Sequence, residues 1–319
     1  MYRVGVVGGE THIGEVTALA GSRLQIVAAA VRDDQAEWES RTLGCPVVSD
    51  YRRLLDEFDP DVISVANEND LRAEVILAAL QAGKDVICDK PLCLRMDEQD
   101  AIEQALAGSP ERRVLNLLTL RGQPRWMALR DVVQSGRIGT PAFTHVRMAV
   151  RLKRDERPPW FLDYRRSGGL FLDLLIHGLD QVEWLTGRRI VGVSANQGNL
   201  GDPVAPGLRD HAAVYCELDD GSAAVCEGQR MLPDTKGSDY RVTVAGTGGY
   251  ADLAMAEDRL TVTDREAGDA VVAKAPDAVS VVADWLDGGD VVPQDASLRA
   301  NRLAVLATLA AEQSTRLQV

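Results

Sequence analysis

Residues 62–92 read VISVANENDLRAEVILAALQAGKDVICDKPL and contain one complete strand-helix-strand unit. The apolar run 62–66 predicts a strand, the alanine-rich run 71–81 predicts a helix, and residues 86–88 predict a second strand. The second strand has to end at Pro91, because proline has a fixed φ and no N–H to donate to a sheet. Strand, helix and strand in this order form a βαβ unit and predict a parallel sheet.

The same alternation continues over residues 1–120. Strands are expected at residues 4–7, 24–31, 46–48, 62–66, 86–88 and 113–118, and helices at 13–20, 36–43, 51–58, 71–81 and 97–107. We therefore predict an N-terminal α/β domain built on a parallel sheet.

Beyond residue 120 the pattern changes. Helices are expected at residues 125–134, 169–185 and 296–313, and strands at 141–150, 189–196, 211–218, 222–229, 240–246 and 258–264. The turn signal Asp219-Asp220-Gly221 indicates a hairpin. Residues 121–319 are therefore predicted to form an α+β domain with a mostly antiparallel sheet, and the C-terminal helix 296–313 is expected to pack back on the first domain.

The amino-acid composition excludes several classes of protein and of binding partner. With 319 residues and 45% hydrophobic side chains, the chain is long enough for two domains with apolar cores. It has no apolar run of about 18 residues, so no membrane span is expected, and the first strand begins too close to Met1 for a signal peptide. Five scattered cysteines without a CxxC pair predict a cytoplasmic protein with no metal site. The net charge of −13 argues against a nucleic acid or an anionic membrane as partner.

Lys90 follows the strand expected at residues 86–88. It is therefore expected at the carboxyl edge of the sheet, where open α/β folds bind their ligands. The chain has only five lysines against thirty arginines, so a lysine at this position is not expected to be an ordinary solvent-exposed residue. We therefore select Lys90 as a candidate functional residue.

The loop after the first strand reads GGETHIG, residues 8–14. A dinucleotide fingerprint has the pattern G-x-G-x-x-G at this place. Read from Gly9, the first and third glycines are present, but Thr11 occupies the middle position, where its Cβ crowds the pyrophosphate and its hydroxyl can donate to it. The alternative is a glycine turn that only packs a helix on the sheet. The predicted cofactor-binding residues of this loop are Gly8, Gly9, Thr11, His12, Ile13 and Gly14.

Arg32 follows Val31, the expected tip of the second strand. An acid at this tip binds the ribose 2′-OH of NAD, whereas an arginine accommodates the 2′-phosphate of NADP. Arg32 therefore favours NADP. In the alternative interpretation Arg32 is solvated, and Asp33 or Asp34 caps the next helix.

Asp173 and His177 are four residues apart in a helix that is entered through Gly168 and Gly169. At this spacing two side chains share one helix face. A carboxylate beside a histidine fixes its tautomer and raises its basicity, and a neutral histidine is the usual acceptor of an alcohol proton. The alternative is a structural hydrogen bond, which is the more common role of an isolated pair of this kind.

Three segments resemble the family of glucose-fructose oxidoreductase, inositol dehydrogenase and rhizopine-catabolism proteins. Residues 83–92 resemble its Glu-Lys-Pro segment, with Asp89 in place of the glutamate. Residues 135–141, SGRIGTP, resemble the linker into its second domain, and residues 167–180 resemble its Gly-Gly…Asp-x-x-x-His-x-x-Asp segment. The resemblance covers nearly the whole chain, and three segments in the right order are more specific than any one of them.

The resemblance implies a dinucleotide-binding Rossmann domain at residues 1–120 and a substrate-binding and oligomerisation domain at 121–319 with a large open sheet. It implies NAD(P) as cofactor and a homodimer or homotetramer formed through the C-terminal sheet. The catalytic set that it implies is Lys90, Asp173 and His177. It also implies a cis peptide between Lys90 and Pro91, which an X-Pro bond adopts at modest cost.

The departures from the family lie on the cofactor side. The phosphate loop lacks its middle glycine, and residues 67–72 read NENDLR where the family commonly has Thr-Pro-x-x-x-His over the cofactor. In this segment Asn67 and Asn69 are the predicted cofactor-binding residues, and Arg32 and Lys90 complete the predicted set. These changes bear on the affinity and placement of the cofactor rather than on the fold.

The sequence therefore predicts an NAD(P)-dependent dehydrogenase acting on a hydroxyl or carbonyl of a sugar, polyol or related polar small molecule. His177 is expected to take the hydroxyl proton, Lys90 to polarise the same oxygen, and Asp173 to orient its neighbours. The predicted substrate contacts are Lys90, Trp160, Asp173 and His177. Two alternatives remain: a lyase or glycosidase that holds and recycles NAD, and a non-catalytic sensor with weakened dinucleotide binding.

Overall fold

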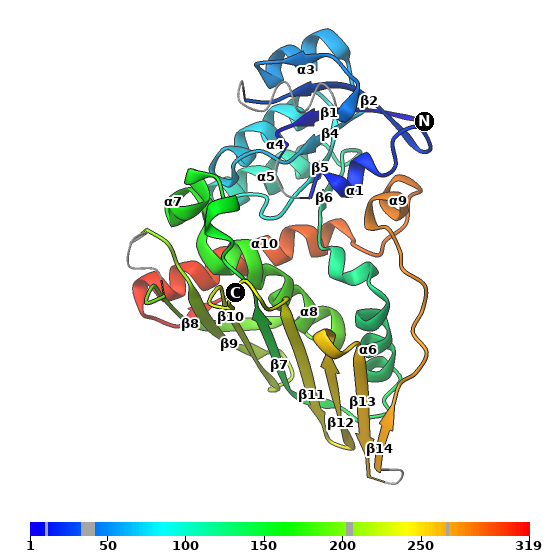
Figure 1. The fold of residues 1–319 in the computed structure, drawn as a ribbon, viewed down its shortest axis with the longest axis vertical. Coiled ribbons are helices and arrows are strands. Elements are labelled where there is room, and N and C mark those ends of the chain that lie inside the picture. The colour runs from blue at the N-terminus through cyan, green and yellow to red at the C-terminus, as the bar shows by residue number, and fades with distance from the viewer. Residues whose placement is uncertain (10–11, 33–41, 202–206, 266–267) are drawn as a thin grey trace. The chain divides into compact units, whose positions relative to one another are not determined.

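The structure, a computed structural model, describes residues 1–9, 12–32, 42–201, 207–265 and 268–319. These residues form two compact units. The first unit contains Met1–Leu118 and Ser280–Asn301, and the second contains Thr119–Val279 and Arg302–Val319 (Figure 1). The helix expected at 36–43 falls largely outside the described residues, and so do Asp33 and Asp34, the capping residues of the alternative interpretation.

Within the described ranges, the first unit is built on a six-stranded sheet with the order β3-β2-β1-β4-β5-β6. All neighbouring strands are parallel. The strands are β1 (Tyr2–Val7), β2 (Leu24–Ala30), β3 (Val47–Val48), β4 (Val62–Val65), β5 (Asp85–Cys88) and β6 (Val114–Asn116). The order reverses between β1 and β4, which is the arrangement of a Rossmann fold and the place of its ligand crevice. The predicted α/β class of this half is confirmed.

The strands of the first unit are connected by α1 (Gly14–Thr17), α3 (Tyr51–Phe58), η1 (Asn69–Leu71), α4 (Arg72–Gln81) and α5 (Met96–Gly108). Helix α9 (Val281–Leu286) comes late in the chain and also belongs to this unit. Asp50 caps α3 by accepting a hydrogen bond from the backbone N–H of Arg52, and α3 buries Leu54 against the sheet. The predicted helix at residues 13–20 was too long, because α1 ends at Thr17. Ala20 already forms an isolated β-bridge with Leu24 of β2, so the helix has to end before Ala20.

The last helix, α10 (Gln294–Gln313), begins in the first unit. Three of its side chains accept hydrogen bonds from backbone N–H groups near β5 and β6: Gln294 from Val114 at 2.9 Å, Ser297 from Asn116 at 3.0 Å and Asn301 from Leu92 at 2.8 Å. Residues late in the chain therefore satisfy the open edge of the parallel sheet and the loop that follows Lys90.

The second unit is built on a sheet with the order β14-β13-β12-β11-β7-β10-β9-β8-β15, nine strands in its described part. The pairing of β7 with β10 is parallel and the other pairings are antiparallel. The strands are β7 (Pro141–Ala149), β8 (Ile190–Gly198), β9 (His211–Leu218), β10 (Ala223–Gln229), β11 (Asp239–Gly246), β12 (Gly249–Ala254), β13 (Arg259–Asp264), β14 (Gly268–Val271) and β15 (Leu317–Gln318). The predicted mostly antiparallel sheet is confirmed, whereas β12, β14 and β15 were not predicted.

The two faces of this sheet differ. In β7 the side chains of Thr144, Val146 and Met148 are buried, while those between them are not. Helices α6 (Pro124–Gln134) and α8 (Ile176–Thr186) cover the buried face, as Figure 1 shows. The uncovered face carries Phe143 and Tyr215, which are 43% and 44% exposed.

The sequence pattern predicted one uniform helix around Asp173 and His177. The structure instead divides this segment into two kinds of helix. Phe171–Leu175 is π-helical, and α8 follows directly at Ile176. The chain enters through Gly168 and Gly169, whose φ angles of +82° and +69° favour glycine. Because a π-turn holds more residues than an α-turn, the four-residue spacing no longer requires Asp173 and His177 to share one helix face.

Shorter helical segments complete the second unit. They are α7 (Tyr164–Ser167) and the 3-10 turns η2 (Thr119–Gly122), η3 (Arg154–Glu156), η4 (Pro159–Leu162) and η6 (Met255–Glu257). No helix in the described ranges is both long enough and apolar enough to cross a membrane.

Candidate functional site

The carboxyl edge of the parallel sheet brings together the loops after β1, β4 and β5. The N–H of Gly8 donates to Ala30 at 2.8 Å, and the N–H of Ala66 donates to Val7 at 2.7 Å. Gly8 has φ +80°, and a Cβ there would collide with the backbone of Asn67. The first glycine of the loop is therefore required by the close packing of β1 against the end of β4.

Lys90 lies at this edge, directly after β5, and is 7% exposed. The Lys90–Pro91 peptide is cis, as the resemblance implied. The fully buried Arg72 fixes the backbone here, because its Nη1 donates to the carbonyl oxygens of Asp89, Lys90 and Pro91 at 2.9, 2.5 and 3.2 Å. Its Nε donates to the carbonyl of Asn67 at 3.0 Å. One guanidinium thus connects the end of β4 to the lysine loop, residues 89–91.

Asp89 is 1% exposed and lies between the side chains of His12 and Arg72. Its Oδ1 is 2.7 Å from Nδ1 of His12, and its Oδ2 is 3.4 Å from Nη2 of Arg72. Burial alone would raise the pKa of this carboxyl, but the charges of His12 and Arg72 outweigh burial and hold the pKa well below its usual range. Asp89 is therefore an ionised carboxylate inside the first unit.

The other predicted cofactor residues of this unit have different surroundings. Ile13 and Asn69 are buried, and a Cβ at Gly14 would meet open space. Asn67 is buried at the end of β4, and its Oδ1 has no hydrogen-bond partner within the described part of the chain. Gly9 follows Gly8 in the loop, and Thr11 lies outside the described residues.

Two of these observations fit a dinucleotide. A buried amide oxygen without a partner calls for a donor from a ligand, and Asn67 places one beside the β1–β4 crevice. Gly8 also permits the tight turn that a dinucleotide-binding loop makes after its first strand. The residues present therefore suit a bound NAD(P) at the usual place of a Rossmann fold.

Arg32 forms an ion pair with Glu68, with Nη1 2.7 Å from Oε1. The two side chains come from the segments that follow β2 and β4. A 2′-phosphate at Arg32 would have to share the guanidinium with this carboxylate. Glu68 was not singled out from the sequence, since only the spatial order of the strands brings it to Arg32.

In the second unit, Asp173 and His177 are buried, with 9% and 8% of their surface exposed. The Asp173 carboxylate forms an ion pair with Arg230, which follows β10. Burial, and then the like charge of Arg157, lowers the pKa of the Arg230 guanidinium to about 9, so it remains charged at neutral pH. Arg230 was not predicted from the sequence, because no motif around Asp173 indicates it.

An aromatic side chain supports this ion pair. The guanidinium groups of Arg230 and Arg157 lie 4.9 Å and 4.3 Å from the centroid of the Phe161 ring. Trp160, a predicted substrate residue, packs edge-on against Phe161 at 5.8 Å and is 6% exposed. Its Nε1 has no hydrogen-bond partner among the residues that the structure describes.

Asp180, the last acid of the motif, has a structural partner. Its carboxylate accepts from Nε of Arg121 at 3.0 Å and from Nη2 at 2.7 Å, and both side chains are buried. Burial raises the pKa of Asp180, and the paired guanidinium opposes this shift. A bidentate pair of this kind fixes α8 and, with it, His177.

The predicted catalytic residues are thus divided between the two units. Lys90 lies in the first, with Asp89 and His12 nearby, and Asp173 and His177 lie in the second, with Arg230. Their assembly into one catalytic set remains a prediction.

Two family profiles match the chain. Residues 2–115 match the oxidoreductase family with an NAD-binding Rossmann fold, and residues 126–252 match the GFO/IDH/MocA C-terminal domain. The chain belongs to the GFO/IDH/MocA oxidoreductase family. The resemblance inferred from three sequence segments is confirmed.

Curated relatives of this GFO/IDH/MocA protein include an uncharacterized oxidoreductase, YrbE of Bacillus subtilis. It is 28% identical over 281 residues, which are 85% of this chain and 79% of the relative. Inositol 2-dehydrogenase of Rhizobium meliloti is 29% identical over 77% of this chain and 74% of its own length. Myo-inositol 2-dehydrogenase of Thermotoga maritima is 28% identical over 83% of this chain and 79% of its own length. The last two of these relatives are inositol dehydrogenases by name.

Solved structures share the fold over essentially the whole chain. Levoglucosan dehydrogenase in complex with NADH has a TM-score of 0.85 at 19% identity and covers 100% of this chain and 99% of its own. Myo-inositol 2-dehydrogenase of Lactobacillus plantarum has a TM-score of 0.81 at 22% identity, with the same coverage. At these identities the structures show the fold that this GFO/IDH/MocA chain adopts.

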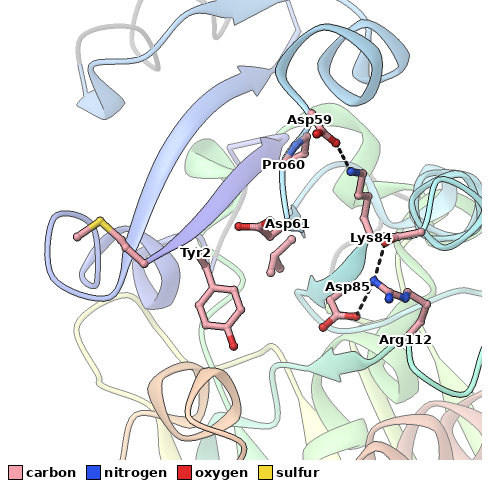
Figure 2. A pocket seen from close by; sticks show the side chains of 10 residues that line it. Tyr2, Asp59, Pro60, Asp61, Lys84, Asp85 and Arg112 are labelled. Carbon is pink, nitrogen blue, oxygen red and sulfur yellow. Dashed lines mark hydrogen bonds and ion pairs between the residues drawn. The ribbon is translucent and has the colours of Figure 1, made fainter.

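A pocket of the first unit lies at the opposite, amino edge of the parallel sheet. It has a volume of about 520 Å³ and is lined by the starts of β1, β4 and β5 (Figure 2). Lys84 pairs with Asp59 there, and Nη1 of Arg112 lies 3.9 Å from Oδ1 of Asp85. Both cationic side chains of the pocket are therefore close to carboxylates, and the pocket lies away from the carboxyl edge of this GFO/IDH/MocA domain.

Proposed function

We propose that this protein is an NAD(P)-dependent dehydrogenase that acts on a hydroxyl or carbonyl of a sugar, polyol or related polar small molecule. Membership of an NAD-binding oxidoreductase family and the names of its relatives support the reaction class. The observation that carries the proposal is Lys90, a buried lysine at the carboxyl edge of a Rossmann sheet whose backbone is clamped by Arg72. A buried ammonium at this edge is suited to polarise a substrate oxygen.

The residues of each unit have distinct roles in this proposal. His177 takes the proton of the substrate hydroxyl as general base, and Lys90 stabilises the charge that develops on the same oxygen. Asp173, which Arg230 keeps in place, binds and orients the polar substrate. When bound, NAD(P) supplies the hydride acceptor, and Gly8, His12 and Asn67 are among the residues that would hold it.

The choice between NAD and NADP remains a prediction. Arg32 favours NADP by its position after β2, and its ion pair with Glu68 offsets part of the charge that a 2′-phosphate would meet. Separate titrations with NADH and NADPH test the choice. Tighter binding of NADH would contradict the NADP preference.

The experiment that tests the reaction is a substrate screen. Purified protein is mixed with NAD or NADP and with inositols, levoglucosan, aldoses and sugar acids, and reduction of the cofactor is followed by absorbance. We expect turnover that depends on one polyol or sugar and on added cofactor. Stoichiometric NAD(H) released from the denatured protein, together with turnover that needs no added cofactor, would contradict the proposal and support an NAD-recycling lyase or glycosidase.

We also propose a homodimer or homotetramer formed through the uncovered face of the C-terminal sheet. The aromatic side chains of Phe143, Tyr215 and Tyr250 are at least 40% exposed and stand on strands β7, β9 and β12. Covering them with a second copy would remove apolar surface from water. Light scattering after gel filtration should give a mass that is a multiple of 34.5 kDa, and Tyr215→Glu should shift the measured mass toward that of the monomer.

A cytoplasmic location of the protein remains a prediction as well.

A further inference from the structure

Gln181 is a buried amide of α8 that has no role in the mechanism proposed above. Its exposed fraction is 0%, and neither Nε2 nor Oε1 has a hydrogen-bond partner within the described part of the chain. Buried polar groups are normally hydrogen-bonded, and a buried amide without partners lowers the stability of the folded state. A leucine would fill nearly the same space without this penalty, so the presence of a glutamine calls for a functional reason.

Two contacts hold α8 in place beside this amide. A Cβ at Gly178 would lie 3.4 Å from Sγ of Cys226, so this side of the helix lies against β10. On another side, Asp180 forms its buried bidentate pair with Arg121. Gln181 follows Asp180 directly, and the two contacts therefore keep its side chain in the interior of the second unit.

His177 lies one helical turn before Gln181. Helix α8 is regular from Ile176 to Thr186, so residues four apart share one of its faces. Long side chains of an α-helix lean toward its N-terminus, and Gln181 therefore leans toward the ring of His177. Cβ atoms at this spacing are about 5–6 Å apart, and polar groups at such a separation are commonly joined by one ordered water.

The ring of His177 needs a group that fixes its tautomer. Its Nδ1 is buried, whereas 8% of the residue is exposed, so a substrate reaches the ring on the side of Nε2. A neutral histidine that acts as base through Nε2 has to carry its hydrogen on Nδ1. The sequence spacing suggested Asp173 for this task, but in the structure the carboxylate of Asp173 binds Arg230.

We propose that Gln181 is a positioning residue for His177. The Nδ1–H group of His177 donates to a buried water, which donates in turn to Oε1 of Gln181, so the lone pair lies on Nε2. The inference rests on the proposed role of His177 as general base and adds a residue that the sequence motifs did not indicate. Because the contact lies within one helix, it depends on neither the cofactor nor Lys90.

The test observes the histidine directly and needs no substrate. The chain has only four histidines, so the imidazole ¹⁵N resonances of the full-length protein can be assigned with one His→Gln variant each. At a pH where the ring is neutral, we expect the hydrogen of His177 on Nδ1 in wild type. Gln181→Leu should move it toward Nε2 and leave the other three histidines unchanged.

Trp126→Phe is the matched control. Trp126 lies on α6, which packs on α8, and its Nε1 is another buried donor without a hydrogen-bond partner among the residues that the structure describes. Removing this N–H should leave the tautomer of His177 unchanged. A change equal to that in Gln181→Leu would assign Gln181 to the packing of α6 and overturn the proposal.

Stability and activity give two further readouts. Gln181→Leu should keep or raise the melting temperature, because it removes an unpaired buried amide. On a substrate found by screening, it should lower kcat about 10-fold and leave KM and the Kd for NADH close to wild type, since only the base is misplaced.

The outcomes separate this inference from the proposed function. An unchanged tautomer of His177 in a folded Gln181→Leu variant would overturn the role of Gln181, even in an active dehydrogenase. If wild type shows no turnover with any cofactor and substrate, the proposed function fails, while the ¹⁵N resonances still decide whether Gln181 orients His177.

Discussion

The carboxylate of Asp173, in the π-helical turn before α8, is held by the guanidinium of Arg230 at the end of β10. Both side chains are buried, and Phe161 covers the guanidinium. The ion pair ties the motif helix to the sheet beneath it. Asp173 is thus held by an ion pair in the helical segment that leads into the helix of the proposed general base.

Replacing Arg230 by methionine should destabilise the protein and lower its activity. It leaves the Asp173 charge buried without its partner, which costs about 3–5 kcal/mol in unfolding free energy. Urea unfolding and kcat/KM on the substrate found by screening measure the two effects. The double variant Asp173→Asn, Arg230→Met should regain stability but not activity. Equal destabilisation of the single and double variants would contradict the pairing.

Lys90→Ala and His177→Ala should each reduce kcat by about two to four powers of ten, because each removes a group that acts on the substrate oxygen. Their Kd for NADH should remain close to that of wild type. The matched lysine control is Lys84→Ala, whose ammonium pairs with Asp59 at the amino edge of the sheet. Near-normal turnover of either catalytic variant would reject its assignment.

Glu68→Gln should strengthen the binding of NADPH relative to NADH about three- to tenfold, because it removes the carboxylate paired with Arg32. Arg32→Ala should abolish this gain in the double variant. Parallel fluorescence titrations with the two reduced cofactors give the ratio. A ratio that does not respond to Glu68→Gln would show that Arg32 does not face the 2′ position.

Asp89 should make stability depend on pH in the acid range. Because its folded pKa lies below the unfolded value of about 3.9, its contribution is present above that value and is lost as the pH falls through the folded pKa. Asp89→Asn should therefore lower the melting temperature at neutral pH, and the difference from wild type should shrink on acidification. A difference that grows on acidification would contradict the assignment of an ionised Asp89.

The sequence predicted most of the parallel sheet, because the buried strands β1, β4 and β5 are short apolar runs that end at glycine, asparagine or proline. It also predicted the antiparallel sheet from alternating runs such as that of β9. It did not predict β14 and β15, which are short and have no alternation of buried and exposed residues. The π-turn at Phe171–Leu175 was missed because side-chain periodicity over five residues does not reveal a change of backbone hydrogen bonding.

In the candidate site, too, the sequence predicted features that depend on neighbouring residues but not contacts between residues far apart in the chain. Lys90 could be placed at the carboxyl edge because a neighbouring proline ends its strand. The site residues have partners from distant parts of the sequence. These are Arg72 on α4 for the residues around Lys90, Glu68 after β4 for Arg32, and Arg230 after β10 for Asp173. Only strand order brings such residues together, so local motifs do not reveal them.

The contacts of α10 with the first unit have a consequence for biosynthesis. Asn301 supplies the acceptor for Leu92 beside the lysine loop, and Ser297 supplies the one for Asn116 on β6. These partners are synthesised only after residues 119–279 of the second unit. Although domains generally fold in order from the N-terminus, the Rossmann unit of this protein cannot be completed before those residues have been made. The nascent chain therefore exposes an unfinished parallel sheet while residues 119–279 are being synthesised.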